Sequence, residues 1–179
     1  MAKSGIGGQF ELVDGNSKKV SSQELLGKWL LIYFGFTHCP DICPDEMQKM
    51  VDTVNLLEKD GIDVIPVFIS VDPDRDTPQV VKKYASEFSS KIIALTGNKE
   101  QVQQAAKAFR VYHSLGPKDK FEDYIVDHTI ITYLINPKGN FVDYYGNRKN
   151  AQQMRNSILS HMKNYEILEK KSWLDAMFK

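Results

Sequence analysis

The sequence predicts an α/β fold in which flanking helices cover a central mixed sheet and a hairpin comes first. Strand-like apolar segments alternate with amphipathic helical segments along most of the chain. A hairpin pattern near the C-terminal end closes this alternation. The chain has 179 residues, 42% of them hydrophobic, which is enough for one domain with a sizeable core.

The first half of the chain is expected to contain a hairpin, two buried strands and two helices. In chain order these are strands 10–13 and 19–20 around Asp14-Gly15-Asn16, strand 29–34, helix 44–59, strand 64–70 and helix 78–88. The two later strands are continuous apolar runs, and Pro66 removes one ladder hydrogen bond from the second. Gly61 ends the first helix, whereas Thr77 caps the second and Pro78 occupies its first position.

The second half continues the alternation. Its expected elements are strand 92–95, helix 98–109, strands 124–126, 129–135 and 141–145, and helix 150–162. Asn98 and Asn150 each precede a glutamine by three residues, which predicts capped helix starts. Residues 112–123 are expected to form a loop, and the tail from Asn164 has a helical composition. This order of elements is typical of a thioredoxin-like sandwich.

Composition excludes several classes of function. Lysine plus arginine and aspartate plus glutamate both number 23, so nothing indicates binding to nucleic acid or to an acidic surface. The longest apolar run, residues 29–36, is far shorter than the roughly 20 residues of a membrane helix. No presequence is visible, and residues 1–5 resemble an artificial start, so an anchor ahead of this sequence is left open.

Both cysteines of the protein, Cys39 and Cys43, lie between the strand 29–34 and the following helix. If that helix begins near Ile42, Cys43 lies in its first turn and Cys39 on the loop before it. The free N–H groups of a helix start favour thiolate over thiol. We therefore expect both sulfurs to face one point in space.

The spacing of the cysteines leaves more than one use open. Thioredoxins have two residues between their cysteines, and this chain has three, so the match to that redox motif is loose. A purely structural disulfide would close a short loop and gain little chain entropy. Two thiolates also select soft metals, and two sulfurs with one imidazole suit copper better than structural zinc.

Four histidines could supply the imidazole. His38 adjoins Cys39, where neighbouring side chains tend to point apart. His113 lies in the expected loop, and His161 lies on the inner side of the last helix. His128 precedes strand 129–135, which a thioredoxin-like layout brings beside the dithiol. Asp127 is expected to accept a hydrogen bond from the His128 ring and so to orient it. A histidine satisfied by hydrogen bonds alone remains the alternative.

These residues resemble the Sco (SenC) copper-binding proteins of cytochrome c oxidase assembly. The resemblance covers roughly residues 7–163, and residues 116–129 are similar to the mitochondrial branch. The segments that carry it are Gly27 through Pro44, Ile69 through Thr77, Leu95-Thr96-Gly97 and Tyr124 through Thr129. We treat residues 1–163 as one copper-binding domain and 164–179 as a C-terminal tail.

The resemblance implies a thioredoxin-like domain in the intermembrane space, bound to the inner mitochondrial membrane through an anchor absent from this sequence. It implies that Cys39, Cys43 and His128 bind one copper, as Cu(I) or Cu(II). It implies delivery to the binuclear copper site of cytochrome c oxidase subunit II, with a small intermembrane-space chaperone as the copper donor. The oligomeric state stays open, and a homodimer is one alternative.

Two enzymatic alternatives use the same cysteines. A thiol–disulfide oxidoreductase would need Cys39 and Cys43 as catalytic residues but not His128, and the family is linked to reducing the cysteines of subunit II. A peroxide reductase would place a threonine or serine before one attacking cysteine, which Thr37-His38-Cys39 only loosely imitates. The acidic turn 72–76 is either a partner surface or a solvated loop before the cap at Thr77.

Overall fold

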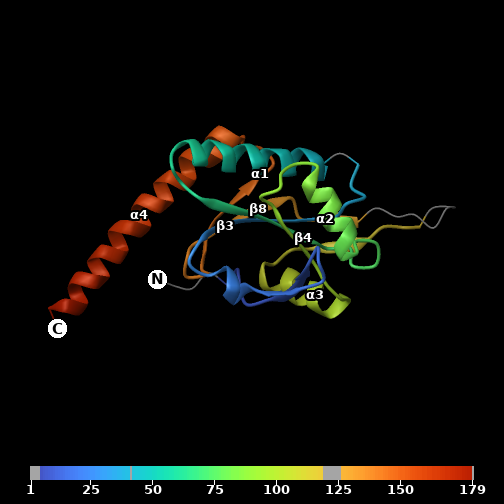
Figure 1. Ribbon diagram of the computed structural model, residues 1–179, viewed down its shortest axis with the longest axis horizontal. Coiled ribbons are helices and arrows are strands. Elements are labelled where there is room, and N and C mark those ends of the chain that lie inside the picture. The colour runs from blue at the N-terminus through green and yellow to red at the C-terminus, as the bar shows by residue number, and fades with distance from the viewer. Residues whose placement is uncertain (1–4, 41, 119–125, 179) are drawn as a thin grey trace.

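The computed structural model describes residues 5–40, 42–118 and 126–178, and it confirms the predicted α/β sandwich (Figure 1). A seven-stranded mixed sheet has the order β2-β1-β5-β4-β3-β8-β9. Its strands are β1 (Glu11–Asp14), β2 (Lys19–Ser21), β3 (Trp29–Gly35), β4 (Val64–Ser70), β5 (Ile93–Thr96), β8 (Ile131–Ile135) and β9 (Phe141–Gly146). Strands β3, β4 and β5 are parallel, and the pairs at both ends of the sheet are antiparallel.

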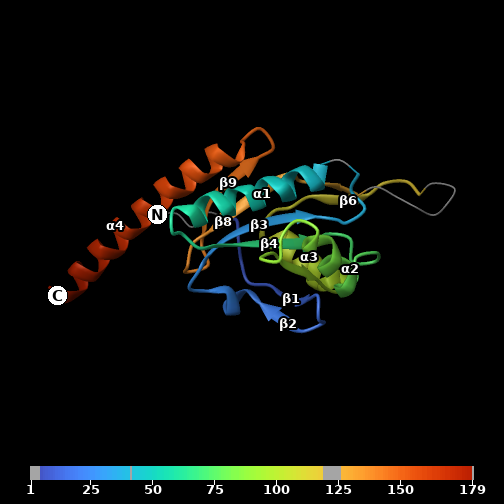
Figure 2. The same cartoon turned by 45° about the horizontal axis from the view of Figure 1, so that its top comes forward.

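The helices are α1 (Ile42–Lys59), α2 (Pro78–Ser86), α3 (Lys99–Ala108) and α4 (Ala151–Met177), with a short 3-10 turn, η1, at Ser22–Leu25. Figure 2 shows α1 and α4 side by side on one face of the sheet. Ring contacts show which helix covers which face. Phe68 of β4 packs on Tyr84 of α2, whereas Phe34 of β3 packs on Phe109 at the end of α3. Tyr33 pairs with Phe68 across β3 and β4 and donates a hydrogen bond to Cys43 of α1, so α1 and α2 lie on the face opposite α3.

Local sequence signals explain most element boundaries. The side chain of Thr77 accepts a hydrogen bond from the Val80 N–H at the start of α2. Asn98 and Asn150 form capping boxes with Gln101 and Gln153, as predicted. Pro66 lies in the central strand β4, but pairing with β5 begins only at Val67, so the proline stands before that ladder.

Three expectations about boundaries are wrong. Residues 113–115 form a strand, β6 (His113–Leu115), which pairs with β7 (Val126–His128) in a two-stranded ribbon outside the main sheet. The predicted strand 129–135 begins only at Ile131, so His128 ends β7 instead of standing at the mouth of β8. Helix α4 does not end near Met162 but runs to Met177, since residues 164–177 contain neither glycine nor proline.

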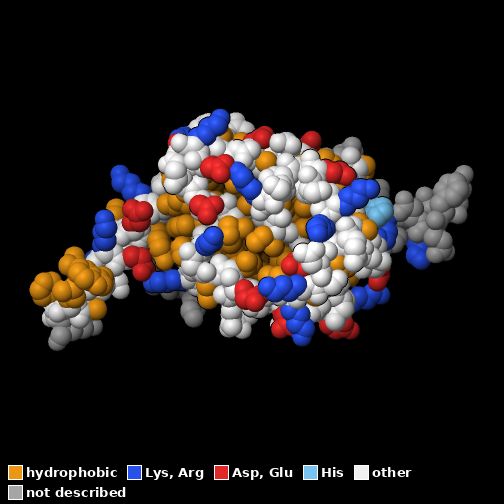
Figure 3. Space-filling view, in the orientation of Figure 1, with side chains coloured by type: hydrophobic (Ala, Val, Ile, Leu, Met, Phe, Trp, Pro, Cys, Tyr) orange, Lys and Arg blue, Asp and Glu red, His pale blue; other side chains and the backbone are white. Residues whose placement is uncertain are grey.

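The last turns of α4 extend away from the body of the protein (Figure 1). Its buried residues are Met154, Ile158 and Met162. Farther along, Tyr165 packs edge-on against Trp29, and Glu169 pairs with Lys138 at 2.6 Å. Apolar side chains then gather at the helix end (Figure 3), where Trp173, Leu174, Met177 and Phe178 are all exposed.

Candidate metal centre

Cys43 is held in the core of the protein by the helix that carries it. Helix α1 begins at Ile42, so Cys43 lies in its first turn, as expected, and its side chain is fully buried. The hydroxyl of Tyr33, on β3, donates a hydrogen bond to the Cys43 Sγ at 3.4 Å. This sulfur is therefore fixed by both the sheet and the helix.

Cys39 lies on the loop before α1 and is only partly buried. Its Sγ accepts a hydrogen bond from the Cys43 backbone N–H at 3.4 Å. The sulfur thus takes up one of the N–H groups that a helix start leaves unpaired. Both cysteines are free thiols in the structure.

His128 brings its imidazole to the same point from the ribbon. Its Nε2 lies 3.4 Å from the Cys43 Sγ. Its Nδ1 lies 3.0 Å from the carbonyl oxygen of Thr129, which can only accept, so Nδ1 carries the proton and donates to it. The lone pair of Nε2 is then directed toward the sulfur, the tautomer that a metal ligand requires.

The three donor atoms form one compact group. The Cys39 Sγ, the Cys43 Sγ and a ring nitrogen of His128 all lie within 4.8 Å of one another. The rings of Tyr33 and Phe36 meet the imidazole edge-on, with centroids 6.1 and 5.5 Å away. Because these aromatic rings shield the imidazole from water, His128 is only 9% exposed. Two thiols and an imidazole suit a soft metal ion.

The electrostatics of Cys43 differ from the sequence-based expectation. Burial raises the pKa of the Cys43 thiol to about 12, and the hydrogen bond from Tyr33 lowers it only in part. Desolvation therefore outweighs the effect of the helix start, and in the metal-free protein Cys43 is a thiol instead of the expected thiolate. A metal ion binding there must displace this proton.

The other histidines occupy different surroundings. His113 faces His128 across the ribbon but is not part of the donor group. His161 lies 2.7 Å from Asp143. The imidazole of His38 contacts the Thr37 hydroxyl, and it forms a second potential metal-ligand group with Asp72 and Asp76. The side chain of Asp127, the expected acceptor, lies outside the described residues, and the Thr129 carbonyl accepts from His128.

The acidic turn 72–76 corrects another expectation. Asp72 is 1% exposed and Asp76 is fully buried, so these two carboxylates are not solvated, whereas Asp74 between them is exposed. Arg75 donates to Asp72 at 2.6 Å, and Ser70 donates to Asp76 at 2.6 Å. Buried carboxylates need such partners, which sequence patterns alone do not reveal.

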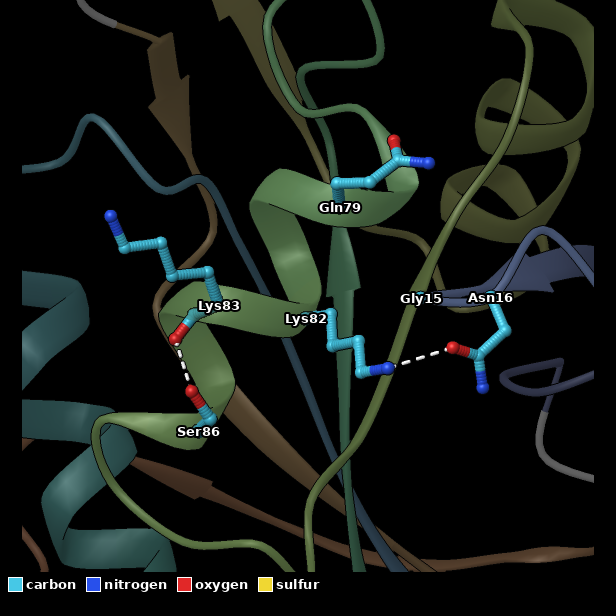
Figure 4. A pocket seen from close by; sticks show the side chains of 6 residues that line it. All are labelled: Gly15, Asn16, Gln79, Lys82, Lys83 and Ser86. Carbon is cyan, nitrogen blue, oxygen red and sulfur yellow. Dashed lines mark hydrogen bonds between the residues drawn. The ribbon is translucent and has the colours of Figure 1, made fainter.

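A surface pocket elsewhere offers no comparable chemistry. It lies between the β1–β2 turn and α2 and is lined by Gly15, Asn16, Gln79, Lys82, Lys83 and Ser86 (Figure 4). Lys82 donates to Asn16 at 2.7 Å across it. Neither sulfur nor imidazole contributes to its lining, so the cysteine–histidine group is the stronger candidate.

Comparison with known proteins identifies the family. The family model described as SCO1/SenC matches residues 1–163. The chain belongs to the SCO1/SenC family. The human mitochondrial SCO1 homolog is 51% identical over 164 residues, covering 89% of this chain and 54% of that protein. Mitochondrial SCO1 of Saccharomyces cerevisiae is 42% identical over 184 residues, covering 99% of this chain and 62% of that protein.

Solved structures of SCO1/SenC proteins have the same fold. Copper-bound ScoI of Arabidopsis thaliana has a TM-score of 0.85 and 44% identity, covering 89% of this chain and 99% of that one. Copper-bound yeast Sco1 has a TM-score of 0.86 and 43% identity, covering 93% of each chain. The chain spans about half the length of the first curated relatives it matches. In the part of the chain that the structure describes, no helix is long and apolar enough to cross a bilayer.

Proposed function

We propose that this protein is a copper metallochaperone. Cys39, Cys43 and His128 bind one copper ion, as Cu(I) or Cu(II), and the protein delivers it to the binuclear copper site of cytochrome c oxidase subunit II. The observation that carries the proposal is the placement of two sulfurs and one imidazole nitrogen within 4.8 Å of one another. The copper-bound relatives from Arabidopsis and yeast support the choice of metal.

The same site suits a cargo that must be released. Three protein donors leave room for an incoming ligand on copper, since soft ions also accept sulfur ligands from a partner. Cys39 is partly exposed and Cys43 is fully buried, so an incoming sulfur reaches the Cys39 side first. Copper then passes through shared-thiolate intermediates without free ion being released.

The mitochondrial names of the relatives support a mitochondrial location. Within the mitochondrion we propose the inner membrane, with this domain in the intermembrane space. A small copper-donor chaperone of that compartment loads the site, and subunit II receives the ion. We take residues 1–163, the range of the family match, as the copper-binding domain and residues 164–179 as the tail.

A second candidate function is thiol–disulfide exchange at the cysteines of subunit II. The two free thiols, one of them partly exposed, favour it. BsSco, a member of the Sco family that is 26% identical with a TM-score of 0.68, is described as containing a disulfide switch. In this reaction two electrons and two protons pass from the Cys39–Cys43 dithiol to the partner's disulfide, and the cysteines themselves become a disulfide.

Anaerobic titration of the reduced protein with copper tests the first function. We expect one copper per chain, with Cu(II) giving a thiolate-to-metal charge-transfer absorption. His128→Ala should lower the affinity for copper by more than the roughly 10- to 100-fold that is usual when a residue that only orients a metal ligand is substituted. His113→Ala is the matched control, because it removes the facing imidazole of the ribbon and leaves the donor group intact.

Two outcomes separate the candidate functions. Transfer of copper from the loaded protein to an apo subunit II domain supports the metallochaperone. Reduction of a disulfide substrate that needs both cysteines but is unchanged in His128→Ala supports the oxidoreductase. Wild-type stoichiometry and affinity in His128→Ala would remove this residue from the site.

A further inference from the structure

The fully buried carboxylate of Asp76 is bonded to the loop that carries Cys39. Asp76 lies between β4 and α2. Its Oδ2 accepts the Thr37 backbone N–H at 3.0 Å and the Ser70 hydroxyl at 2.6 Å, and its Oδ1 accepts the Thr37 hydroxyl at 2.6 Å. Hydrogen bonds to a buried charged group are strong, so this contact fixes Thr37 firmly.

The position of Cys39 depends on this contact more than the position of Cys43 does. Cys43 is fixed by α1 and by core packing, whereas Cys39 precedes the helix, which begins at Ile42. Between β3 and α1 the chain turns sharply, and the Cys39 N–H donates to the Phe36 carbonyl at 3.3 Å. Thr37 lies inside that turn. Its two bonds to Asp76 therefore set the position from which the Cys39 side chain extends.

We propose that Asp76 is a positioning residue for the metal centre, which holds the Cys39 sulfur within coordinating reach of Cys43 and His128. The inference rests on the proposed copper site and adds a residue that does not touch the metal. Asp76 acts through its hydrogen bonds to Thr37, across 39 positions of sequence. Loosening that contact would leave Cys43 and His128 in place and release the third donor.

The alternative role for this cluster, a second metal site with His38 and Asp72, fits the contacts less well. Both oxygens of Asp76 already accept hydrogen bonds, and Asp72 accepts from Arg75 at 2.6 Å. A cation would have to displace these donors and approach the guanidinium of Arg75. His38 Nδ1 lies 3.2 Å from the Thr37 hydroxyl and 3.7 Å from Asp76 Oδ1, so it lies next to the contact between Thr37 and Asp76.

Substitutions at Thr37 test the inference with little change to the core. Thr37→Val removes the hydroxyl and keeps the backbone N–H, whereas Thr37→Ser retains both bonds. Ser70→Ala is the control, because it deletes a bond of similar length to the same carboxylate from β4, together with the bond that the Ser70 hydroxyl accepts from the Asp72 N–H, and both lie outside the cysteine loop. Asp76→Asn keeps the size of the side chain and removes its charge.

We expect Thr37→Val and Asp76→Asn to lower copper affinity about 10- to 100-fold, the usual range for residues that orient metal ligands. The charge-transfer absorption per bound Cu(II) should also fall, because one sulfur is displaced. Thr37→Ser and Ser70→Ala should keep the wild-type affinity and absorption. A role in folding alone would change the melting temperature without changing the absorption per bound copper.

The outcomes keep the inference and the proposed function apart. If the wild type itself binds no copper, the proposed function fails whatever the variants do. If the wild type binds one copper and Thr37→Val matches it in affinity and absorption, the positioning role of Asp76 is overturned. Should Asp76→Asn fail to fold, the comparison of Thr37→Val with Thr37→Ser decides alone.

Discussion

The backbone of β3 passes very close to the sulfur of Cys43, at Gly35. A Cβ placed on Gly35 would lie 2.9 Å from the Cys43 Sγ, 2.8 Å from the Tyr33 ring and 3.1 Å from the Phe68 ring. All three side chains are fully buried, so none can move without disturbing its neighbours. The absence of a side chain at this residue is a requirement of the metal centre.

Gly35→Ala should therefore destabilise the protein by about 1–3 kcal/mol, the usual cost of overpacking a core. It should also weaken copper binding, because the added methyl group displaces the Cys43 sulfur. Chemical denaturation and anaerobic copper titration measure the two effects. Gly146→Ala is the control, since a Cβ there has nothing within 4 Å. Equal behaviour of the two variants would show that β3 can shift to accept the methyl group.

Among the elements, α1 carries Cys43, and its far end is tied to α4. Asp60 follows α1 and forms a two-point ion pair with Arg155 of α4, with distances of 2.7 Å from Nε to Oδ2 and from Nη2 to Oδ1. The hydrogen bond and charge of Arg155 hold the pKa of Asp60 below its ordinary value of 3.8. The pair therefore stabilises the folded state when Asp60 is ionised.

The sign of this pH dependence follows from the lowered pKa. The stabilising contribution is fully present above pH 3.8, and it is lost as the pH falls through the folded-state pKa of Asp60. Arg155→Gln should thus melt slightly below the wild type at neutral pH, and the difference should vanish in strong acid. High salt should shrink the difference at neutral pH, because both groups are exposed. A difference that is independent of pH would mean that Arg155 acts through packing.

At the scale of the whole molecule, the end of α4 contributes little to the fold. The last described contacts between this helix and the body come from Tyr165 and Glu169, and the apolar side chains beyond them are exposed. The proposed copper site and the core are built from residues before 163.

A chain ending at Lys170 should keep the melting temperature and copper stoichiometry of the full chain. A chain ending at Lys163 should lose about 0.5–1.5 kcal/mol, because the contact of Tyr165 with Trp29 is removed. It should still bind one copper. Calorimetry and copper titration of the two truncations test this, and loss of copper from the shorter chain alone would contradict the domain boundary at 163.

The sequence predicted what depends on local pattern. The apolar run of β3 and the caps at Thr77, Asn98 and Asn150 match the structure, and α1 begins at Ile42, two residues before the predicted start at 44. Strand β6 was missed because its side chains alternate weakly and Leu115 is 59% exposed, so no apolar face marks it. A ribbon of this kind is recognisable only through its partner strand.

The donor set could be proposed from sequence, but its surroundings could not. The Thr129 carbonyl that orients His128 is a backbone atom, which every residue possesses. Asp76 reaches Thr37 from 39 residues away, and its burial reverses the usual expectation for an acidic turn. The raised pKa of Cys43 reflects the depth of packing, which outweighs the helix start that sequence reveals.

His128 belongs to a ribbon that shares no ladder with the described strands of the seven-stranded sheet. An outward displacement of the ribbon would break no ladder hydrogen bond of these strands, while the two sulfurs would keep their positions near the start of α1. His128 would then lose its contacts with the Cys43 Sγ and with the rings of Tyr33 and Phe36. The three donors thus belong to two parts of the fold with separate hydrogen-bond ladders, and the imidazole is the donor whose displacement leaves the ladder of the main sheet intact.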